Sequence, residues 1–276
     1  MTVPGYATDV LVDADWAKAH LDDPTVRFVE VDVDTTAYEQ SHMPGRRRLE
    51  LDEPAGRRDP PRHRRSRGLQ RSCCRTSGIG PDTTIVLYGD NNNWFAAWAY
   101  WQLKLYGHRD VRILNGGRKY WLDNGLPLSD RRAGLRRRPA TSCPSPTSRL
   151  RAFRDDILPR LGDPELALVD VRSPGRVQRR DHRASRHERD RPAGRPHPGR
   201  RVASRGPRRS ARTARSRAAD ELATLYEAKG VTPDKDVIAY CRIGERSSHT
   251  LVRAPRAARL QAGSATTTAA GPSAAA

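Results

Sequence analysis

Short apolar runs alternate along the first 130 residues with stretches whose apolar side chains recur at helical spacing. The period-two alternation from Val26 to Val33 predicts a strand, and the segments at 78–90 and 110–117 each combine a strand with a turn. Near the amino terminus, Asp13 or Asp15 is placed to cap a short helix. Strands that alternate with helices predict an α/β fold with a mostly parallel sheet.

An aromatic stripe occupies the helical segment that follows residue 90. The stripe repeats at helical spacing, and Gly107 is placed to end the helix. Its members are Trp94, Ala97, Trp98 and Trp101. Such a stripe is more typical of a buried core than of a binding site, so we predict that it packs inside the protein.

The second half of the chain repeats the pattern of the first. The two matching pairs of segments are 23–32 with 163–172, and 78–90 with 230–242. Two copies of one domain explain both matches. We therefore predict a domain at 9–130, a linker at 131–149 and a second domain at 150–276, of which 176–217 and 251–276 depart from the pattern.

One stretch of the second copy, V-I-A-Y-C-R-I-G-E-R-S-S-H-T, combines features that activate a cysteine. Residues 237–240 predict a buried strand that ends on Cys241, and a loop containing Gly244 follows. Serine and threonine then offer N-cap chemistry for a helix start, at Ser247, Ser248 and Thr250. Backbone N–H groups between residues 242 and 247 are thereby expected to converge on the sulfur.

Positive charge near this cysteine favours a thiolate. Arg242 and Arg246 lie close in sequence, and cations beside a helix start lower the pKa of a cysteine from its usual value of about 8.5. The alternative is a free cysteine at a strand end that serves as a small hydrophobic residue. Because strand, glycine loop and cations coincide, we favour a nucleophilic Cys241.

The segment Y-C-R-I-G-E-R-S-S-H-T resembles the active loop of the rhodanese family of sulfurtransferases. Its C-R-x-G form is closer to the thiosulfate type than to the C-G-S-G type that uses mercaptopyruvate. The resemblance implies two rhodanese-like α/β domains and a cysteine persulfide that carries sulfane sulfur from thiosulfate to cyanide or a thiol. It implies no cofactor and no metal.

The resemblance also assigns roles within the loop. Cys241 would be catalytic, and the substrate would be bound by Arg242, Ile243, Gly244, Glu245, Arg246, Ser247 and Arg172. Arg172 equally fits a structural ion pair with Asp170 or Glu245, and Asp170 fits a turn better than a catalytic acid. His249 is expected to be a capping or exposed residue. Mammalian-type members carry lysine where Ile243 stands, so the preference between sulfur donors stays open.

The first copy lacks this chemistry, because Gly89 and Asp90 stand where the second copy has Cys241 and Arg242. It resembles the inactive amino-terminal domain of tandem rhodaneses, and S-H-M-P-G at 41–45 resembles their G-H-I-P-G element. Cysteine phosphatases are the nearest competitor by chemistry. Their loop has an arginine six residues after the cysteine, whereas this chain has Ser247 there and Arg246 one residue early, which favours sulfur transfer.

The formal net charge of +19 is confined to three segments. Residues 46–75, 131–138 and 176–217 hold 32 arginines, no lysine and 7 acids, while the rest of the chain holds 19 basic and 25 acidic residues. Misread GC-rich codons give arginine without lysine, so we hypothesise that these segments are translated out of frame. Their low apolar content predicts disorder, and Pro255 would interrupt the helix expected after the active loop.

Other bulk features set the expected setting of the protein. We see no secretory signal and no apolar run of about 18 residues, which predicts a cytoplasmic protein that does not span a membrane. The four cysteines show no disulfide spacing. We expect a monomer or weak oligomer that does not bind nucleic acid. Two alternatives stay open: a catalytically dead rhodanese-like relic, and a basic nucleic-acid-binding module.

Overall fold

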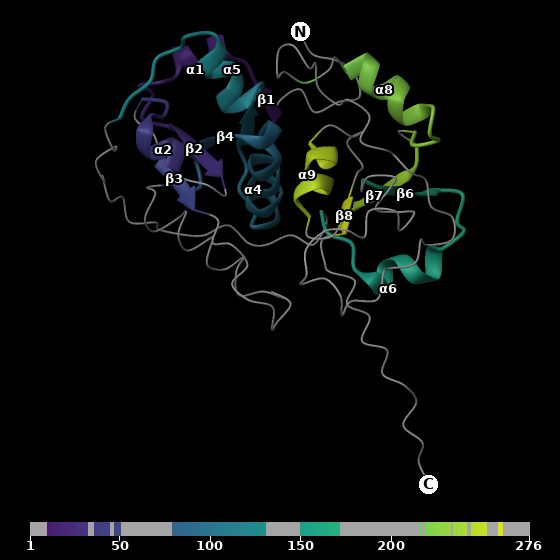
Figure 1. Cartoon of the computed structure of the whole chain (residues 1–276). Helices are drawn as coiled ribbons and strands as arrows, with labels where there is room; N and C mark the ends of the chain where they lie inside the picture. Colours follow the sequence, from purple (N-terminus) through teal and green to yellow (C-terminus); the bar gives the residue numbers. More distant parts are fainter. Residues whose placement is uncertain are drawn as a thin grey trace, which may run out of the picture.

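The computed structural model describes residues 10–32, 36–44, 47–50, 79–130, 150–171, 216, 219–232, 234–241, 244–252 and 259–261. These residues form two α/β units, here called the amino-terminal half (10–130) and the carboxyl-terminal half (150–261) (Figure 1). Each half is built around its own parallel sheet. The predicted fold class is confirmed, whereas the domain boundaries stay predictions.

The sheet of the amino-terminal half has the strand order β1-β5-β4-β2-β3, and each neighbouring pair is parallel. Its strands are β1 (Leu11–Val12), β2 (Val26–Asp32), β3 (Arg47–Glu50), β4 (Thr84–Tyr88) and β5 (Val111–Leu114). The helices of this half are α1 (Ala14–Ala19), α2 (Thr36–Gln40), the 3₁₀ helix η2 (Asn91–Asn93), α4 (Trp94–Leu105) and α5 (Gly117–Asp123).

The sheet described in the carboxyl-terminal half has the order β6-β7-β8, again parallel. Its strands are β6 (Leu166–Asp170), β7 (Asp236–Tyr240) and β8 (Arg259–Gln261). Its helices are α6 (Arg154–Ile157), the 3₁₀ helix η3 (Leu158–Arg160), α8 (Ala219–Glu227) and α9 (Glu245–Leu251). In Figure 1, α9 lies beside α4, and the two helices are in contact.

Both faces of the amino-terminal sheet are covered. On β2, Val29 and Val31 enter one buried cluster, whereas Val26 and Phe28 enter another. The alternation that predicted this strand therefore sorts side chains between two cores instead of between core and solvent. Burial on both faces is usual for parallel sheets whose connections carry helices.

The internal repeat predicted from the sequence recurs in the strand pairing. Val26 pairs with Thr84 between β2 and β4, and Leu166 pairs with Asp236 between β6 and β7. In the two sequence matches, Val26 is equivalent to Leu166 and Thr84 is equivalent to Asp236. The halves therefore share the register of their central strand pair, which places Gly89 and Cys241 at equivalent strand ends.

Local signals explain where several helices begin and end. Asp13 is the N-cap of α1, and its Oδ1 accepts a hydrogen bond of 2.8 Å from Trp16 N–H. Gly107, with φ of 80°, lies just beyond α4, where the left-handed conformation favours glycine. The aromatic stripe packs as predicted at Trp101, which is 1% exposed, and Trp98 is partly buried.

Some of the segments expected to be disordered or aberrant contain ordered backbone. Residues 47–50 form the edge strand β3, residues 259–261 form β8, and Ser216 N–H donates to Asn115 Oδ1 at 2.8 Å. The expectation of disorder is wrong at residues 47–50 and at Ser216, because backbone pairing does not require apolar side chains and edge strands tolerate charge. Residues 259–261 lie in 251–276, where a departure from the repeat, not disorder, is predicted. The remainder of the three arginine-rich segments and Pro255 lie outside the described residues.

Candidate active site

Cys241 directly follows β7 and belongs to the buried cluster of the carboxyl-terminal half. Its side chain is a free thiol and the residue is 8% exposed. Gly244 N–H donates to Cys241 Sγ at 3.1 Å, and Ser247 Oγ lies 3.5 Å from the same sulfur. A main-chain donor and a hydroxyl thus meet at the sulfur. The sequence predicted backbone donors here, and the hydroxyl of Ser247 is an addition to that prediction.

The turn that makes this possible depends on Gly244. Its φ of 108° lies in a region that residues with a Cβ rarely adopt. That conformation turns the chain so that Gly244 is the N-cap of α9 while its N–H faces back towards the sulfur. The glycine therefore sets both the start of the helix and the direction of the donor.

The predicted N-cap residues are wrong, because α9 begins at Glu245, before the first serine. The two serines lie inside the first turns, where their hydroxyls reach back to the carbonyl of Gly244. Ser247 Oγ lies 3.0 Å and Ser248 Oγ 2.7 Å from that oxygen. Serine hydroxyls often bond to preceding carbonyls in this way, so they secure the first turn from within.

Polar side chains on α9 are buried. Ser247, Ser248 and Thr250 are fully buried, and His249 is 4% exposed, so the expectation of an exposed histidine is wrong. A capping role for His249 stays a prediction. Arg246 is 9% exposed, and its Nη1 has no hydrogen-bond partner among the residues that the structure describes. A guanidinium held in this state favours an anion nearby, because a buried charge without a partner is costly.

The structure reaches only part of the predicted site. Cys241, Gly244, Arg246 and Ser247 come together around the start of α9. Arg172, Arg242 and Ile243 lie outside the described residues, and so does the side chain of Glu245. Asp170 is the last residue of β6 and is fully buried, so its predicted place in a turn is wrong.

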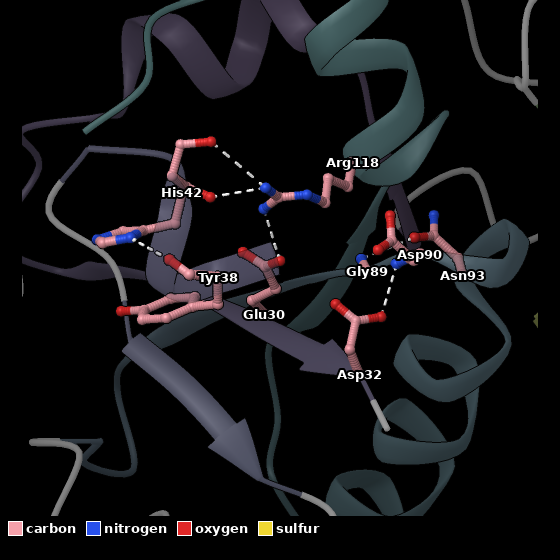
Figure 2. Close-up of polar contacts among 9 residues, drawn as sticks. Glu30, Asp32, Tyr38, His42, Gly89, Asp90, Asn93 and Arg118 are labelled. Atoms are coloured by element: carbon pink, nitrogen blue, oxygen red, sulfur yellow. Dashed lines mark hydrogen bonds and ion pairs between the residues drawn. The ribbon is translucent and has the colours of Figure 1, made fainter. Parts of the chain in front are cut away.

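The equivalent loop of the amino-terminal half uses its donors differently (Figure 2). Gly89 N–H donates to Asn93 Oδ1 at 3.0 Å, and Asp90 N–H donates to Asp32 Oδ1 at 2.7 Å. Asn93 also donates through Nδ2 to Leu114 O at 2.8 Å, which ties the loop to β5. Two side-chain oxygens of the chain itself therefore occupy the amide groups of this loop.

Carboxylates surround that loop. Burial raises the pKa of Asp32 to about 7, and the charges of Asp90 and Glu30 raise it as well, against the lowering effect of the hydrogen bond from Asp90 N–H. Burial also raises the pKa of Glu30, although Arg118 acts in the opposite direction. The loop equivalent to the cysteine loop therefore lies beside carboxyl groups, those of Asp32 and Asp90.

A buried ion pair links this region to the S-H-M-P-G segment. Arg118 Nη1 lies 2.7 Å from Glu30 Oε1, and its Nη2 donates to Ser41 O at 2.7 Å (Figure 2). His42 stacks on Tyr38 with ring centroids 4.1 Å apart. Sequence reasoning missed this network, because Glu30 and Arg118 are 88 positions apart and no local pattern connects them.

Comparison with known proteins decides the family. A protein of Haloferax volcanii named "Putative thiosulfate sulfurtransferase" is 40% identical over 257 residues, which cover 90% of this chain and 87% of that protein. The chain belongs to the rhodanese family. A rhodanese-like domain is also matched directly at residues 13–124.

Solved structures show the same fold. The crystal structure of YnjE matches with a TM-score of 0.76 at 22% identity, covering 95% of this chain and 66% of that one. The 3-mercaptopyruvate sulfotransferase SseA from Escherichia coli matches with a TM-score of 0.70 at 20% identity, covering 92% of this chain and 98% of that one. The rhodanese fold thus extends over both halves of this chain.

Within the described ranges, no helix has the length and apolar character needed to cross a bilayer. In the same part of the chain, no group of three or more His, Cys, Asp or Glu side chains is arranged to hold a metal ion.

Proposed function

We propose that this rhodanese moves sulfane sulfur from thiosulfate to a thiophilic acceptor, either cyanide or a thiol, through a persulfide on Cys241. The observation that carries the proposal is the hydrogen bond of 3.1 Å from Gly244 N–H to Cys241 Sγ. A main-chain donor aimed at a sulfur stabilises negative charge there without having to reorganise during the reaction. Membership of the rhodanese family and the name of the haloarchaeal relative support the same chemistry.

The reaction takes two displacement steps. In the first, Cys241 thiolate attacks the outer sulfur of thiosulfate, a new S–S bond forms, and the old S–S bond breaks as sulfite leaves with its electron pair. In the second, the acceptor attacks the outer sulfur of the persulfide, and Cys241 leaves as a thiolate. The cysteine is thereby regenerated, and no oxidant or reductant is consumed.

Charge around the loop suits an anionic donor. Arg246 is nine-tenths buried, and its Nη1 has no hydrogen-bond partner in the described part of the chain, so an anion bound at the loop would stabilise its charge. Ser247 Oγ adds a donor 3.5 Å from the sulfur. Within the proposal, Arg242, Ile243, Glu245 and Arg172 complete the substrate-binding set.

Mass spectrometry tests the proposal on the full chain. Incubation with thiosulfate without air should add about 32 Da to the peptide that contains Cys241, because one sulfur atom is retained. Cyanide should then remove the added mass and release thiocyanate. A wild-type protein that stays at its original mass at saturating thiosulfate would overturn the proposal.

Replacement of the nucleophile gives the matching prediction for activity. We expect Cys241→Ser to lower thiosulfate:cyanide transfer by about a thousandfold or more, because the covalent route is lost. Turnover by Cys241→Ser at the wild-type rate would show that another group carries the sulfur.

The second candidate is a rhodanese-like relic, and the burial of Cys241 favours it. A residue only 8% exposed resembles a structural cysteine, which is inert towards reagents. Iodoacetamide at neutral pH separates the two readings, since a relic leaves Cys241 unmodified in the folded protein while a competent site is alkylated.

A further inference from the structure

Helix α4 of the amino-terminal half presents two apolar faces to two different cores. One face packs on the amino-terminal sheet, through Ala96, Ala99, Tyr100 and Leu103. The other face carries Trp98, Trp101 and Leu105 at positions i, i+3 and i+7 and packs into the cluster that contains Cys241. A helix that does not belong to the catalytic half therefore completes the core behind the cysteine.

Helix α9 depends on this support. It has seven residues and is polar up to Leu251, yet most of its side chains are buried. An isolated helix of this length is unstable in water, so neighbouring elements must hold it in place. Helix α4 lies against it (Figure 1), and Val252, just after α9, joins the core cluster of the amino-terminal half.

Two side chains join the cores at this contact. Trp98 of α4 and Leu251 of α9 each pack against both the amino-terminal cluster and the cluster of Cys241. Farther along α4, Trp101 Nε1 donates to Leu150 O at 2.9 Å, and the Arg151 guanidinium lies 5.7 Å from the Trp101 ring centroid. The junction is thus fixed by packing at one point and by a hydrogen bond at another.

From this geometry we propose that Trp98 is a positioning residue for the Cys241 loop. The inference rests on the proposed function, in which the Gly244 N–H stabilises the sulfur. Gly244 is the N-cap of α9, so a displacement of α9 moves this N–H relative to Cys241 Sγ. Hydrogen bonds weaken steeply with distance and misalignment, so a displaced α9 would weaken the hydrogen bond from Gly244 N–H to Cys241 Sγ. A residue of the amino-terminal half thereby sets the geometry of the Cys241 loop in the carboxyl-terminal half.

Trp98 is a better probe than Trp101. Trp101 is 1% exposed and makes a hydrogen bond, so its removal threatens the fold itself. Trp98 is only partly buried, so its variants should stay folded. Trp121 provides the control for a general loss of stability: it is 1% exposed and donates to Pro127 O, as Trp101 does to Leu150 O, but it packs into the separate cluster on the other face of the sheet.

The experiment compares Trp98→Ala, Trp98→Phe and Trp121→Phe in the full chain, with thermal melting to confirm that each variant folds. At saturating thiosulfate, we expect Trp98→Ala to slow sulfur loading on Cys241 about tenfold, with a smaller change in the half-saturating concentration. Trp98→Phe should restore the rate to within about threefold, since an aromatic ring again fills the junction. Trp121→Phe should lower the melting temperature and leave the loading rate unchanged.

Hydrogen exchange at the Gly244 amide provides a readout that does not require activity. Trp98→Ala should lose at least about tenfold in protection at that amide, whereas Trp121→Phe should lose none. Equal protection in wild type and Trp98→Ala, or equal slowing of sulfur loading in Trp121→Phe, would overturn the positioning role. If the wild type takes up no sulfur, the proposed function fails, and the exchange data still decide whether Trp98 positions the loop.

Discussion

The loops after β4 and β7 occupy equivalent places in their sheets but offer their backbone donors to different acceptors. After β7, Gly244 N–H points at Cys241 Sγ. After β4, the amides of Gly89 and Asp90 are taken by Asn93 Oδ1 and by Asp32 Oδ1. The two loops thus share a place in the fold, but after β4 two side-chain oxygens of the chain accept from the loop amides, whereas after β7 a sulfur accepts.

The charged side chains near the two loops also differ. Asp32, Asp90 and Glu30 gather near the first loop, whereas Arg246 stands beside the second. An anion such as thiosulfate is repelled by Asp90 and by the ionised form of Asp32, while Glu30 is paired with Arg118. The same anion is attracted by Arg246. The absence of a thiol at Gly89 and the different local charge therefore act together, so a cysteine placed there should not by itself take up sulfur.

The largest expected effect comes from placing a cysteine in the loop after β4. A Cβ at Gly89 would collide with Val31 O and lie 2.9 Å from Asp32 Oδ1. We expect Gly89→Cys to destabilise the amino-terminal half by about 3 kcal/mol, because backbone atoms cannot yield as side chains do. All five tryptophans lie in residues 16–121, so their fluorescence during urea unfolding measures this loss.

The same variant tests whether the two loops are interchangeable. A stable Gly89→Cys protein that gains about 32 Da at residue 89 after thiosulfate treatment would show that the missing thiol was the whole difference. We expect no gain at that position, since the amides of the loop are already occupied. Wild-type loading at Cys241 in the same sample provides the internal control.

An intermediate effect is expected at Gly244 in the reactive loop. Its φ of 108° makes Gly244→Ala strained by about 1–3 kcal/mol, and relief of that strain turns the N–H away from the sulfur. We expect sulfur loading to slow about tenfold while the fold is retained. The measurement is the single-turnover loading rate, accompanied by the melting temperature.

Gly80→Ala is a suitable control for that substitution. Gly80 has no positive φ, and a Cβ there would meet only Thr83 Oγ1 at 3.8 Å, which is ordinary contact. Unchanged loading in Gly244→Ala would mean that the conformation of Gly244 is not what aims the donor. Slowed loading in Gly80→Ala would instead indicate a general sensitivity to added methyl groups.

Much of this comparison could be predicted from the sequence, because it depends on local patterns and on the internal repeat. The apolar run before Cys241 predicts β7, and Gly244 predicts the turn. The two matched segments place Gly89 at the position equivalent to Cys241. Each of these inferences uses residues that are close along the chain. Strand and turn propensities act at that range, so their signals survive without tertiary information.

Other features depend on contacts that no local pattern records. The start of α9 was missed because a glycine with positive φ began the helix before the expected serine caps. The ion pair between Glu30 and Arg118 joins positions 88 residues apart. The core that the second face of α4 contacts was not predicted either, because an aromatic stripe indicates burial without indicating which core the side chains enter.

The smallest expected effect concerns the acidic side of the comparison and depends on pH. The pKa of Asp32 in the folded protein is about 7, above its ordinary value of 3.8. A carboxyl group with a raised folded pKa adds stability that is fully present below its unfolded pKa and is lost as the pH rises through the folded value. The amino-terminal half should therefore lose stability as the pH rises from 3.8 to about 7, because the buried Asp32 must ionise beside Asp90 and Glu30.

Asp32→Asn removes this ionisation and keeps an oxygen for the hydrogen bond from Asp90 N–H. We expect the variant to gain on the order of 1 kcal/mol over wild type at pH 8 and much less at pH 5, since its amide stays neutral at both. Tryptophan-detected urea unfolding at the two pH values measures the difference, and sulfur loading on Cys241 should not change. A gain of equal size at both pH values would mean that packing, rather than the charge of Asp32, sets the stability of the loop after β4.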